Sequence, residues 1–270
     1  MRICRISQTY PTKENEGKGL HTFFISNLIE EPTLVLTKNY DEEYLKPASH
    51  VKLKRIKYWQ IPFPESNKFS LRWFMAFLSF VIGQCQFAIK SMYHLSRFKP
   101  EIVHLQSPHA FLIGWYAKIF YSSKVITTFH GSDLKRLAKN MLFIKFLNRF
   151  DRFFYVTSQM RPTLINYFGK ERLLYTPSGV DVDFFLNDCD KRDRENILLA
   201  VGNLRWQKNY PTMLKAFSKV LKIFPDYKLV IIGSGSLKET KEIQEIIEKL
   251  NIGFATRLLG YQNRFAVRNY

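Results

Sequence analysis

The sequence predicts an α/β fold in which parallel strands are covered by helices. Short apolar runs alternate with longer amphipathic runs along most of the 270 residues, with short connections between them. Parallel neighbours need a crossover, usually a helix, so this alternation favours parallel sheets with helices on both faces. The polar stretch 185–194 interrupts the alternation once. We therefore expect two α/β units joined by a linker at residues 186–195.

The first unit is expected to span residues 1–185 and to be complete. Ser107 and Pro108 suit the N-cap and the first position of a helix, and a long, mostly apolar run indicates a helix at 70–98. Strands are expected at 2–7, 33–37, 51–58, 101–106, 124–129, 152–157 and 173–176, and further helices at 20–29, 134–150 and 158–168.

The second unit is expected to span residues 196–270 and to be incomplete. Three strands and two helices would make a thin sheet with an exposed edge, so we expect a natural polypeptide that continues or a truncated product. The last residues, 262–270, are expected to have nothing to pack on. The strands are expected at 196–201, 227–232 and 256–259, and the helices at 211–224 and 237–250.

The composition argues against disorder and against a disulfide scaffold. Apolar residues make up 46% and aromatic residues 16% of the chain, which is ample for a packed core. Cys4, Cys85 and Cys189 are far apart and odd in number, which favours a reducing compartment. Residues 1–7 read as a strand and not as the apolar core of a signal peptide. These observations favour a cytoplasmic location.

The chain is strongly basic, with a net charge of +18 shared as +10 in residues 1–190 and +8 in residues 191–270. Such a charge favours an anionic partner, which could be a nucleic acid, an acidic membrane surface or a phosphorylated substrate. The basic residues form no known nucleic-acid-binding motif, so we expect no nucleic-acid partner.

The segment 201–209, VGNLRWQKN, lies between an apolar run and an amphipathic run. It reads as a strand, a tight glycine turn with two cations three residues apart, and then a helix. Arg205, Lys208 and the first N–H groups of the helix would attract the same anion. The sequence therefore predicts a diphosphate site here, although many turns of this kind bind nothing.

Two further glycine turns precede helices. Gly17 and Gly19 lie in the polar segment before the helix at 20–29, and Gly233 and Gly235 follow an apolar strand. Glycines let backbone N–H groups approach a phosphate or a nucleotide, and the alternative is an ordinary connection at the surface. The first turn lacks the full GxGxxG pattern, which weakens a dinucleotide interpretation.

The segment 127–133, TTFHGSD, places His130 at the carboxyl end of a buried strand, where open α/β sheets bind ligands. Gly131 lets the chain turn, and Ser132 or Asp133 can cap the next helix. The alternative is a capped helix with an incidental histidine.

The segment 177–181, PSGVD, brings Ser178 and Gly179 to the same carboxyl edge. Asp181 and Asp183 resemble an acidic DxD metal motif. They follow a turn and lead into the linker, so helix capping and solvation explain them and no metal site is predicted.

Residues 73–89 carry no charge but are slightly too few to span a membrane, which takes about 20 apolar residues. One interpretation is a buried helix, and the other is a membrane-facing aromatic patch flanked by Arg72 and Lys90. Residues 134–172 add nine cations against two anions, which solvated helix faces or an anionic bilayer would explain.

Taken together, these segments resemble the retaining family-4 glycosyltransferases of the GT-B fold. The matching segments follow the family's order along the chain. They are Gly17–Leu20, Pro100–Gln106, Thr128–Asp133, Val156–Ser158, Pro177–Asp181 with Phe184, Val201–Lys208, Leu229–Gly235 and Leu258–Tyr261.

The resemblance implies that a nucleotide-sugar binds between two Rossmann-like domains and that its sugar is transferred with retention of configuration. It implies a cell-envelope glycan or a lipid-linked acceptor, no metal and no other cofactor. The enzyme would act in the cytoplasm, peripherally on the inner face of the cell membrane. An anionic membrane surface would then be a second partner.

The resemblance also implies roles for single residues. His130 would be the catalytic residue near the sugar and the acceptor, and Lys208 would hold the diphosphate. Asn203 stands where the family usually has an arginine, and Arg205, two residues on, is the candidate substitute. Gly17 and Gly19 would approach the donor phosphates, Gly233 and Gly235 would line the nucleotide, and Asp133, Ser178 and Gly179 would lie near the acceptor or the sugar.

The chain departs from the family's pattern at its end. The family's pair of donor-binding glutamates would lie beyond residues 259–261, as would the helix that returns to the first domain. Activity of the 270-residue chain is therefore conditional. The alternative function is a catalytically inactive fragment that binds a membrane or a protein partner through its basic face.

Overall fold

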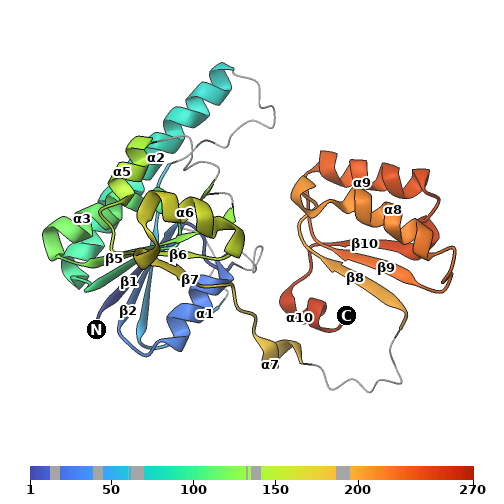
Figure 1. Ribbon diagram of the computed structural model, residues 1–270, viewed down its shortest axis with the longest axis horizontal. Coiled ribbons are helices and arrows are strands. Elements are labelled where there is room, and N and C mark those ends of the chain that lie inside the picture. The colour runs from blue at the N-terminus through green and yellow to red at the C-terminus, as the bar shows by residue number, and fades with distance from the viewer. Residues whose placement is uncertain are drawn as a thin grey trace. The chain divides into compact units, whose positions relative to one another are not determined.

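The computed structural model describes residues 1–12, 19–38, 45–59, 61, 70–131, 133–134, 141–186 and 195–270. These residues form two compact units, 1–179 and 180–270, and each contains its own parallel sheet (Figure 1). The predicted α/β fold is therefore confirmed.

The sheet of the first unit has seven strands in the order β3-β2-β1-β4-β5-β6-β7, and all of its pairs are parallel. The order reverses at β1, whose neighbours are β2 and β4. Ligands of open α/β sheets bind beyond the carboxyl ends of the strands at such a reversal. The strands are β1 (Ile3–Ile6), β2 (Thr33–Lys38), β3 (Val51–Ile56), β4 (Ile102–Leu105), β5 (Lys124–Phe129), β6 (Arg152–Tyr155) and β7 (Leu173–Tyr175).

The cap predicted at Ser107 is confirmed, and α2 has a similar cap at Ser70 that the sequence analysis did not predict. The Ser70 hydroxyl accepts from the Trp73 N–H, and the Ser107 hydroxyl accepts from the His109 N–H. The helix expected at 134–150 is described only as α5, and residues 135–140 lie outside the described part. The helices are α1 (Leu20–Leu28), α2 (Leu71–Phe98), α3 (Phe111–Tyr121), α5 (Met141–Leu147) and α6 (Arg161–Phe168), with 3-10 turns η1 (Pro108–Ala110), η2 (Ser158–Met160) and η3 (Lys170–Arg172).

The two faces of this sheet differ in polarity. Successive strand side chains alternate between faces, so Cys4 and Ile6 join the apolar core with α2, α3, α5 and α6. Arg5 points to the opposite face, where α1 lies (Figure 1). Arg5 is paired in register with His104, and both side chains are buried. A polar layer thus lies beneath α1.

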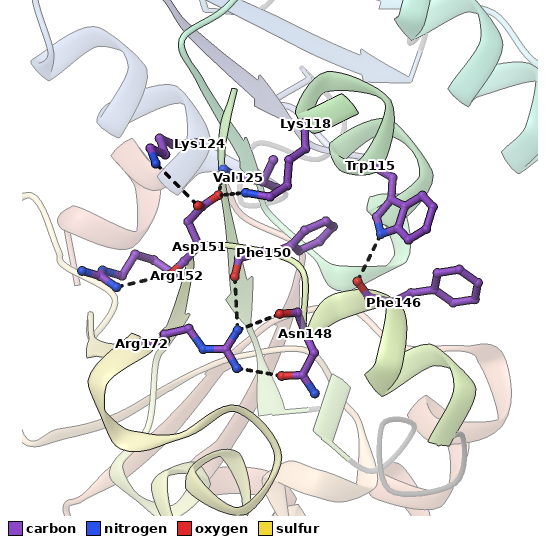
Figure 2. A network of polar contacts seen from close by, with 10 residues as sticks. All are labelled: Trp115, Lys118, Lys124, Val125, Phe146, Asn148, Phe150, Asp151, Arg152 and Arg172. Carbon is purple, nitrogen blue, oxygen red and sulfur yellow. Dashed lines mark hydrogen bonds and ion pairs between the residues drawn. The ribbon is translucent and has the colours of Figure 1, made fainter. Parts of the chain in front are cut away.

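Figure 2 shows a polar network at the amino-terminal edge of the same sheet. The Asp151 carboxylate, just before β6, accepts from Lys118 Nζ at 2.7 Å and from the Val125 N–H at 2.8 Å. Partial burial alone would raise the pKa of Asp151, but these hydrogen bonds bring it below its usual value. Arg172 donates to the Asn148 carbonyl and side chain, each at 2.7 Å. Because ligands bind at the other edge, we assign this network to stability.

The sheet of the second unit has three parallel strands in the order β10-β9-β8. Two helices lie together on one face (Figure 1), where Leu214, Phe217, Leu229 and Ile231 form the core. The elements are α7 (Val182–Phe185), β8 (Ile197–Val201), η5 (Trp206–Lys208), α8 (Tyr210–Val220), β9 (Lys228–Ile232), α9 (Leu237–Lys249), η6 (Gly253–Ala255), β10 (Thr256–Gly260) and α10 (Arg264–Arg268).

The expectation that residues 262–270 have nothing to pack on is wrong. The Arg264 guanidinium lies 3.6 Å from the centre of the Phe184 ring and pairs with Asp181 at 2.9 Å. The rings of Phe265 and Phe184 are also in contact, with centroids 5.3 Å apart. The short helix α10 therefore packs on α7, a contact between segments about 80 residues apart that no local pattern reveals.

The capping role expected for Asp181 is confirmed. Its carboxylate accepts from the Phe184 N–H at 3.1 Å. The hydrogen bond from Arg264, and then the one from the Phe184 N–H, lower the pKa of Asp181. Contacts place α7 in the second unit, and the division between the units falls between Gly179 and Val180.

Candidate functional site

His130 lies directly beyond β5, at the carboxyl edge of the first sheet. Its backbone N–H donates to Asp133 Oδ2 at 2.9 Å, and the Asp133 N–H donates back to the His130 carbonyl at 2.9 Å. His109 Nε2 lies 3.8 Å from the other Asp133 oxygen, Oδ1. The Asp133 side chain is buried. Asp133 therefore holds the turn that carries His130. The structure thus brings together two residues that the sequence analysis assigned to the same site.

His21 meets His130 at this edge, and sequence reasoning missed it. The two ring centroids are 5.6 Å apart, and the rings lie edge to face at 70°. His21 Nε2 is 2.6 Å from Gln106 Oε1, at the end of β4. Burial, and then the charges of His130 and Arg5, lower the pKa of His21 although the bond to Gln106 opposes this.

Gly19 brings the start of α1 close to the strand edge. Its φ of +77° lies in the left-handed region, and a Cβ there would overlap the carbonyl of Thr9. Only glycine allows this close approach. His21 is in the first turn of α1, so Gly19 also sets the position of His21 over the strand ends. Gly17 lies outside the described residues.

The layer beneath His21 contains a buried cation. Arg5 Nη1 lies 2.8 Å from His104 Nδ1, and His104 Nε2 lies 2.8 Å from Thr128 Oγ1. Burial, and then the charge of Arg5, lower the pKa of His104 to about 3, so this imidazole is neutral. Burial also lowers the pKa of Arg5 to about 10, which still leaves it charged at neutral pH.

The two glycine turns of the second unit contact each other. The Gly202 N–H donates to the Ile232 carbonyl at 2.8 Å, and the Leu204 N–H donates to the Ser234 carbonyl at 2.9 Å. Gly233 has a φ of +153°, and a Cβ there would overlap the Gly202 carbonyl oxygen. The turns after β8 and β9 thus form one surface of backbone at the carboxyl edge.

The two cations of 201–209 have different neighbours. The Lys208 side chain lies over Gly202, with Cε 3.3 Å from the position of a Cβ on that glycine. The Tyr210 hydroxyl donates to the Gly202 carbonyl at 2.7 Å and holds the same turn. Arg205 instead lies close enough to Glu239, at the start of α9, to help lower the pKa of that carboxyl group.

The start of α9 carries a capping box that sequence reasoning also missed. The Glu239 N–H donates to Ser236 Oγ at 3.3 Å, and the Ser236 N–H donates to Glu239 Oε2 at 2.8 Å. The Ser-x-x-Glu spacing was the available signal. Gly235 packs just before it, and a Cβ there would lie 2.8 Å from Leu204 Cβ. Side chains thus already cap the helix that follows the second turn.

Ser178 and Gly179 are exposed in the segment after β7. A Cβ added to Gly179 would meet nothing within 4 Å. Within the described residues, no hydrogen bond joins them to His130. Among those same residues, no three His, Cys, Asp or Glu side chains form a group that could hold a metal ion. Metal independence stays a prediction.

Two family models cover the chain from residue 32 to its end. The model of Glycosyltransferase Family 4 matches residues 32–184, which is more than half of the chain. The chain belongs to glycosyltransferase family 4. The model of Glycosyl transferases group 1 matches residues 181–270 of the chain, so the two models meet close to the division between the units.

Solved structures show that this chain has the GT-B fold. Sucrose-phosphate synthase from Thermosynechococcus elongatus superposes with a TM-score of 0.74 at 14% identity, covering 99% of this chain and 72% of that one. Alr3699/HepE from Anabaena, in complex with UDP and glucose, superposes with a TM-score of 0.65 at 13% identity, covering 97% and 70%.

A curated relative is a phosphatidyl-myo-inositol mannosyltransferase of Mycobacterium tuberculosis. It is 25% identical over 152 residues, which are 52% of this chain and 39% of the relative. The match to this relative therefore spans about two fifths of its length.

Proposed function

We propose that the protein transfers a sugar from a nucleotide-sugar to a glycan or lipid-linked acceptor of the cell envelope, with retention of configuration. The observation that carries this proposal is the backbone surface of Gly202 and Gly233 with Lys208 across it. The fold adds support, because the Anabaena protein of the same fold is seen in complexes with UDP and with UDP-glucose.

The chemistry of this surface suits a diphosphate leaving group. Cleavage of a sugar–diphosphate bond builds negative charge on the leaving phosphate, and a preorganised cation with backbone N–H groups stabilises that charge. Lys208 supplies a full positive charge next to the turns of Gly202 and Gly233, where no side chain of these glycines blocks a ligand. We therefore propose Lys208 as the diphosphate ligand and no metal in the reaction. Gly233 and Gly235 would lie along the nucleotide.

Arg205 receives a secondary role in this proposal. Arg205 lies near enough to Glu239 for its charge to help lower the pKa of that carboxyl group, whereas the Lys208 side chain lies over the Gly202 turn. In the first unit, His130 would lie near the sugar and the acceptor, with Gly19 and Asp133 holding the backbone around it. Ser178 and Gly179 remain proposed neighbours of the acceptor.

Calorimetric titration of UDP, UDP-glucose and other nucleotide-sugars tests the donor site. Lys208→Ala should weaken binding about tenfold or more, because charge-assisted hydrogen bonds are the stronger class. Asn203→Ala should weaken it mildly. The control is Lys215→Ala, which removes an exposed lysine from α8 and should change nothing. Equal losses for Lys208 and Lys215 would refute the assignment, as would no binding of any nucleotide.

A second candidate function, membrane attachment, is favoured by α2. Among the described residues, α2 is the one helix long and apolar enough to span a membrane, and a third of that stretch is buried. The expectation of a buried helix is therefore only half right, since one face is buried and the other is exposed. Exposed apolar side chains on α2 are Leu71, Phe74, Met75, Phe77, Leu78, Val81, Ile82 and Ile89.

The charge near these side chains suits an anionic bilayer. α2 contains no acidic residue and carries Arg72, Lys90 and Arg97. On α5, Lys145 is exposed beside Met141 and Leu142, which are 72% and 64% exposed. We propose that this surface attaches the protein peripherally to the inner face of the cell membrane, within reach of a lipid-linked acceptor. The sequence also predicts that Lys135, Arg136, Lys139 and Arg149, all within residues 134–172, act at the membrane. Arg149 lies over the Trp115 ring at 4.5 Å, and the other three lie outside the described residues.

Flotation with liposomes tests this attachment. Binding should require anionic lipid and fall with added salt, because exposed charges are screened. Phe74→Ser with Leu78→Ser should reduce flotation, whereas Leu237→Ser, which changes an exposed leucine of the second unit, should not. Attachment to neutral vesicles at the same level would remove the electrostatic part of the proposal. Loss of flotation with retained nucleotide binding would separate the two functions.

A further inference from the structure

The polar layer beneath α1 connects a buried arginine to the two histidines of the candidate site. Arg5 on β1, His104 on β4 and Thr128 on β5 lie on one face of the sheet, and all three side chains are buried. Gln106, also buried, stands between His104 and His21. The layer is therefore continuous from the centre of the sheet to its carboxyl edge.

The direction of each hydrogen bond in this layer follows from Arg5. A guanidinium can only donate, so His104 Nδ1 must be the acceptor of the 2.8 Å contact. His104 is neutral, so its proton is on Nε2, which donates to Thr128. Arg5 thus decides the tautomer of His104.

The same reasoning extends to His21 through Gln106. Gln106 Nε2 faces His104 Nδ1, which accepts, at 3.5 Å. The amide oxygen of Gln106 therefore points to His21. That oxygen accepts, so His21 Nε2 must carry a proton and donate across the 2.6 Å contact. The neutral form of His21 therefore has its proton on Nε2, and its Nδ1 is left as an acceptor.

We propose that His21 is a positioning residue for His130, held in a single tautomer by the hydrogen-bond chain Arg5–His104–Gln106. The edge-to-face contact of the rings, at 5.6 Å, restricts how the His130 imidazole can turn. An effect of His21 on sugar transfer rests on the proposed role of His130 near the sugar. The tautomer of His21 and its ring contact with His130 do not depend on that role.

The charges around His21 favour a neutral ring. Among the described residues, the titratable and charged groups that act on it are Arg5 from β1, His104 from β4 and His130 from the turn after β5. None of these is acidic, and Asp133 is engaged by the backbone of His130. His21 therefore adds no positive charge beside His130 at neutral pH.

Nuclear magnetic resonance of the 270-residue chain, with isotope-labelled histidine rings, tests the tautomer. The wild type should show His21 with its proton on Nε2 throughout the neutral range. Gln106→Leu removes the acceptor and should give a mixture of tautomers, whereas Gln106→Glu keeps an acceptor and should restore the single tautomer with a higher titration midpoint. A single unchanged tautomer in Gln106→Leu would overturn the proposal. If Gln106→Leu does not fold, the comparison of Gln106→Glu with the wild type still decides it through the midpoint.

The coupling of the two rings is measured separately. His130→Gln should raise the titration midpoint of His21 by about 0.5 to 2 pH units, as expected for two charges at this separation in a medium between water and a protein surface. The control is His50→Gln, because His50 contacts α1 through the Ser26 carbonyl at 3.1 Å but lies outside the chain of contacts. An unchanged midpoint in His130→Gln, or the same change in His50→Gln, would contradict the contact.

Kinetics of a sugar-transferring preparation add a readout that a merely structural role would not move. His21→Leu should lower kcat about tenfold and leave KM for the nucleotide-sugar unchanged, and His21→Gln, which can still donate to Gln106, should recover part of the loss. Equal changes in kcat and KM would argue for a general loss of structure. If no preparation transfers sugar, the proposed function fails, and the resonance experiments still decide the role of His21.

Discussion

At the carboxyl edge of the first sheet, buried and half-buried side chains carry the polar groups, whereas at the edge of the second sheet backbone turns do so. The first edge has His21, Gln106 and His130 above the buried Arg5. The second has two glycine turns in direct contact, crossed by one lysine. All six histidines of the chain lie in the first unit. We therefore expect the stability of the first unit to depend on the protonation of its histidines. The stability of the second unit should depend on whether its glycine turns can remain in contact.

The largest effect should follow an added methyl group in the second unit. Gly233→Ala would place a Cβ on the Gly202 carbonyl oxygen, at a φ of +153° that other residues rarely adopt. We expect the free energy of unfolding of this unit to fall by about 3 kcal/mol or more, since neither strain nor overlap can relax without separating the turns. Hydrogen exchange of the β8 and β9 amides measures this loss.

The matched control lies in the same unit. Gly253→Ala adds the same methyl group where the nearest atom is 3.8 Å away, so its effect on unfolding should be small. If Gly233→Ala were no more destabilising than Gly253→Ala, the contact between the two turns would be wrong. The first unit should be unaffected by either change, because each unit has its own core.

The second effect, of intermediate size, is a difference between the two units in how their free energy of unfolding depends on pH. Burial, and then the charge of Arg5, lower the pKa of His104 to about 3 in the folded protein, and unfolding returns it to about 6.5. Below 6.5 the unfolded chain therefore binds more protons, and stability falls as the pH falls from 6.5 toward 3. We expect the first unit to lose about 2 kcal/mol between pH 7 and pH 5 from this group.

Denaturation with urea at several pH values, followed separately for each unit by hydrogen exchange, checks this expectation. His104→Gln should flatten the dependence, because the amide does not titrate. The second unit should stay flat between pH 7 and pH 5. The raised pKa of Tyr210 bears only on alkaline pH, and the carboxyl groups with a shifted pKa among its described residues are Asp181 and Glu239. Their pKa values are lowered, so their contribution is present above about 4 and is lost only as the pH falls below that. A parallel decline of both units would contradict the contrast.

Much of the fold could be predicted because its signals are local. The glycine turns, the Ser107-Pro108 start and the apolar strands can all be recognised in short windows of sequence. The buried polar layer could not, because it depends on register. Arg5 faces His104 only once β1 and β4 are paired, and single polar residues inside apolar strands do not reveal that pairing. The site was therefore predicted at its turns and missed at His21 and Gln106.

The smallest effect concerns the end of the chain, where residues 262–270 were expected to have no partner. Arg264→Ala removes both the ion pair with Asp181 and the contact with the Phe184 ring. A partly buried ion pair and a cation–π contact each contribute modestly, so we expect a loss of about 1 kcal/mol. Arg268, 5.4 Å from the same ring, offers a matched control whose replacement by alanine should cost less. Limited proteolysis should then cut Arg264→Ala near α10 faster than Arg268→Ala or the wild type. Equal cutting rates for all three would show that the order of α10 does not depend on the contacts of Arg264 with Asp181 and Phe184.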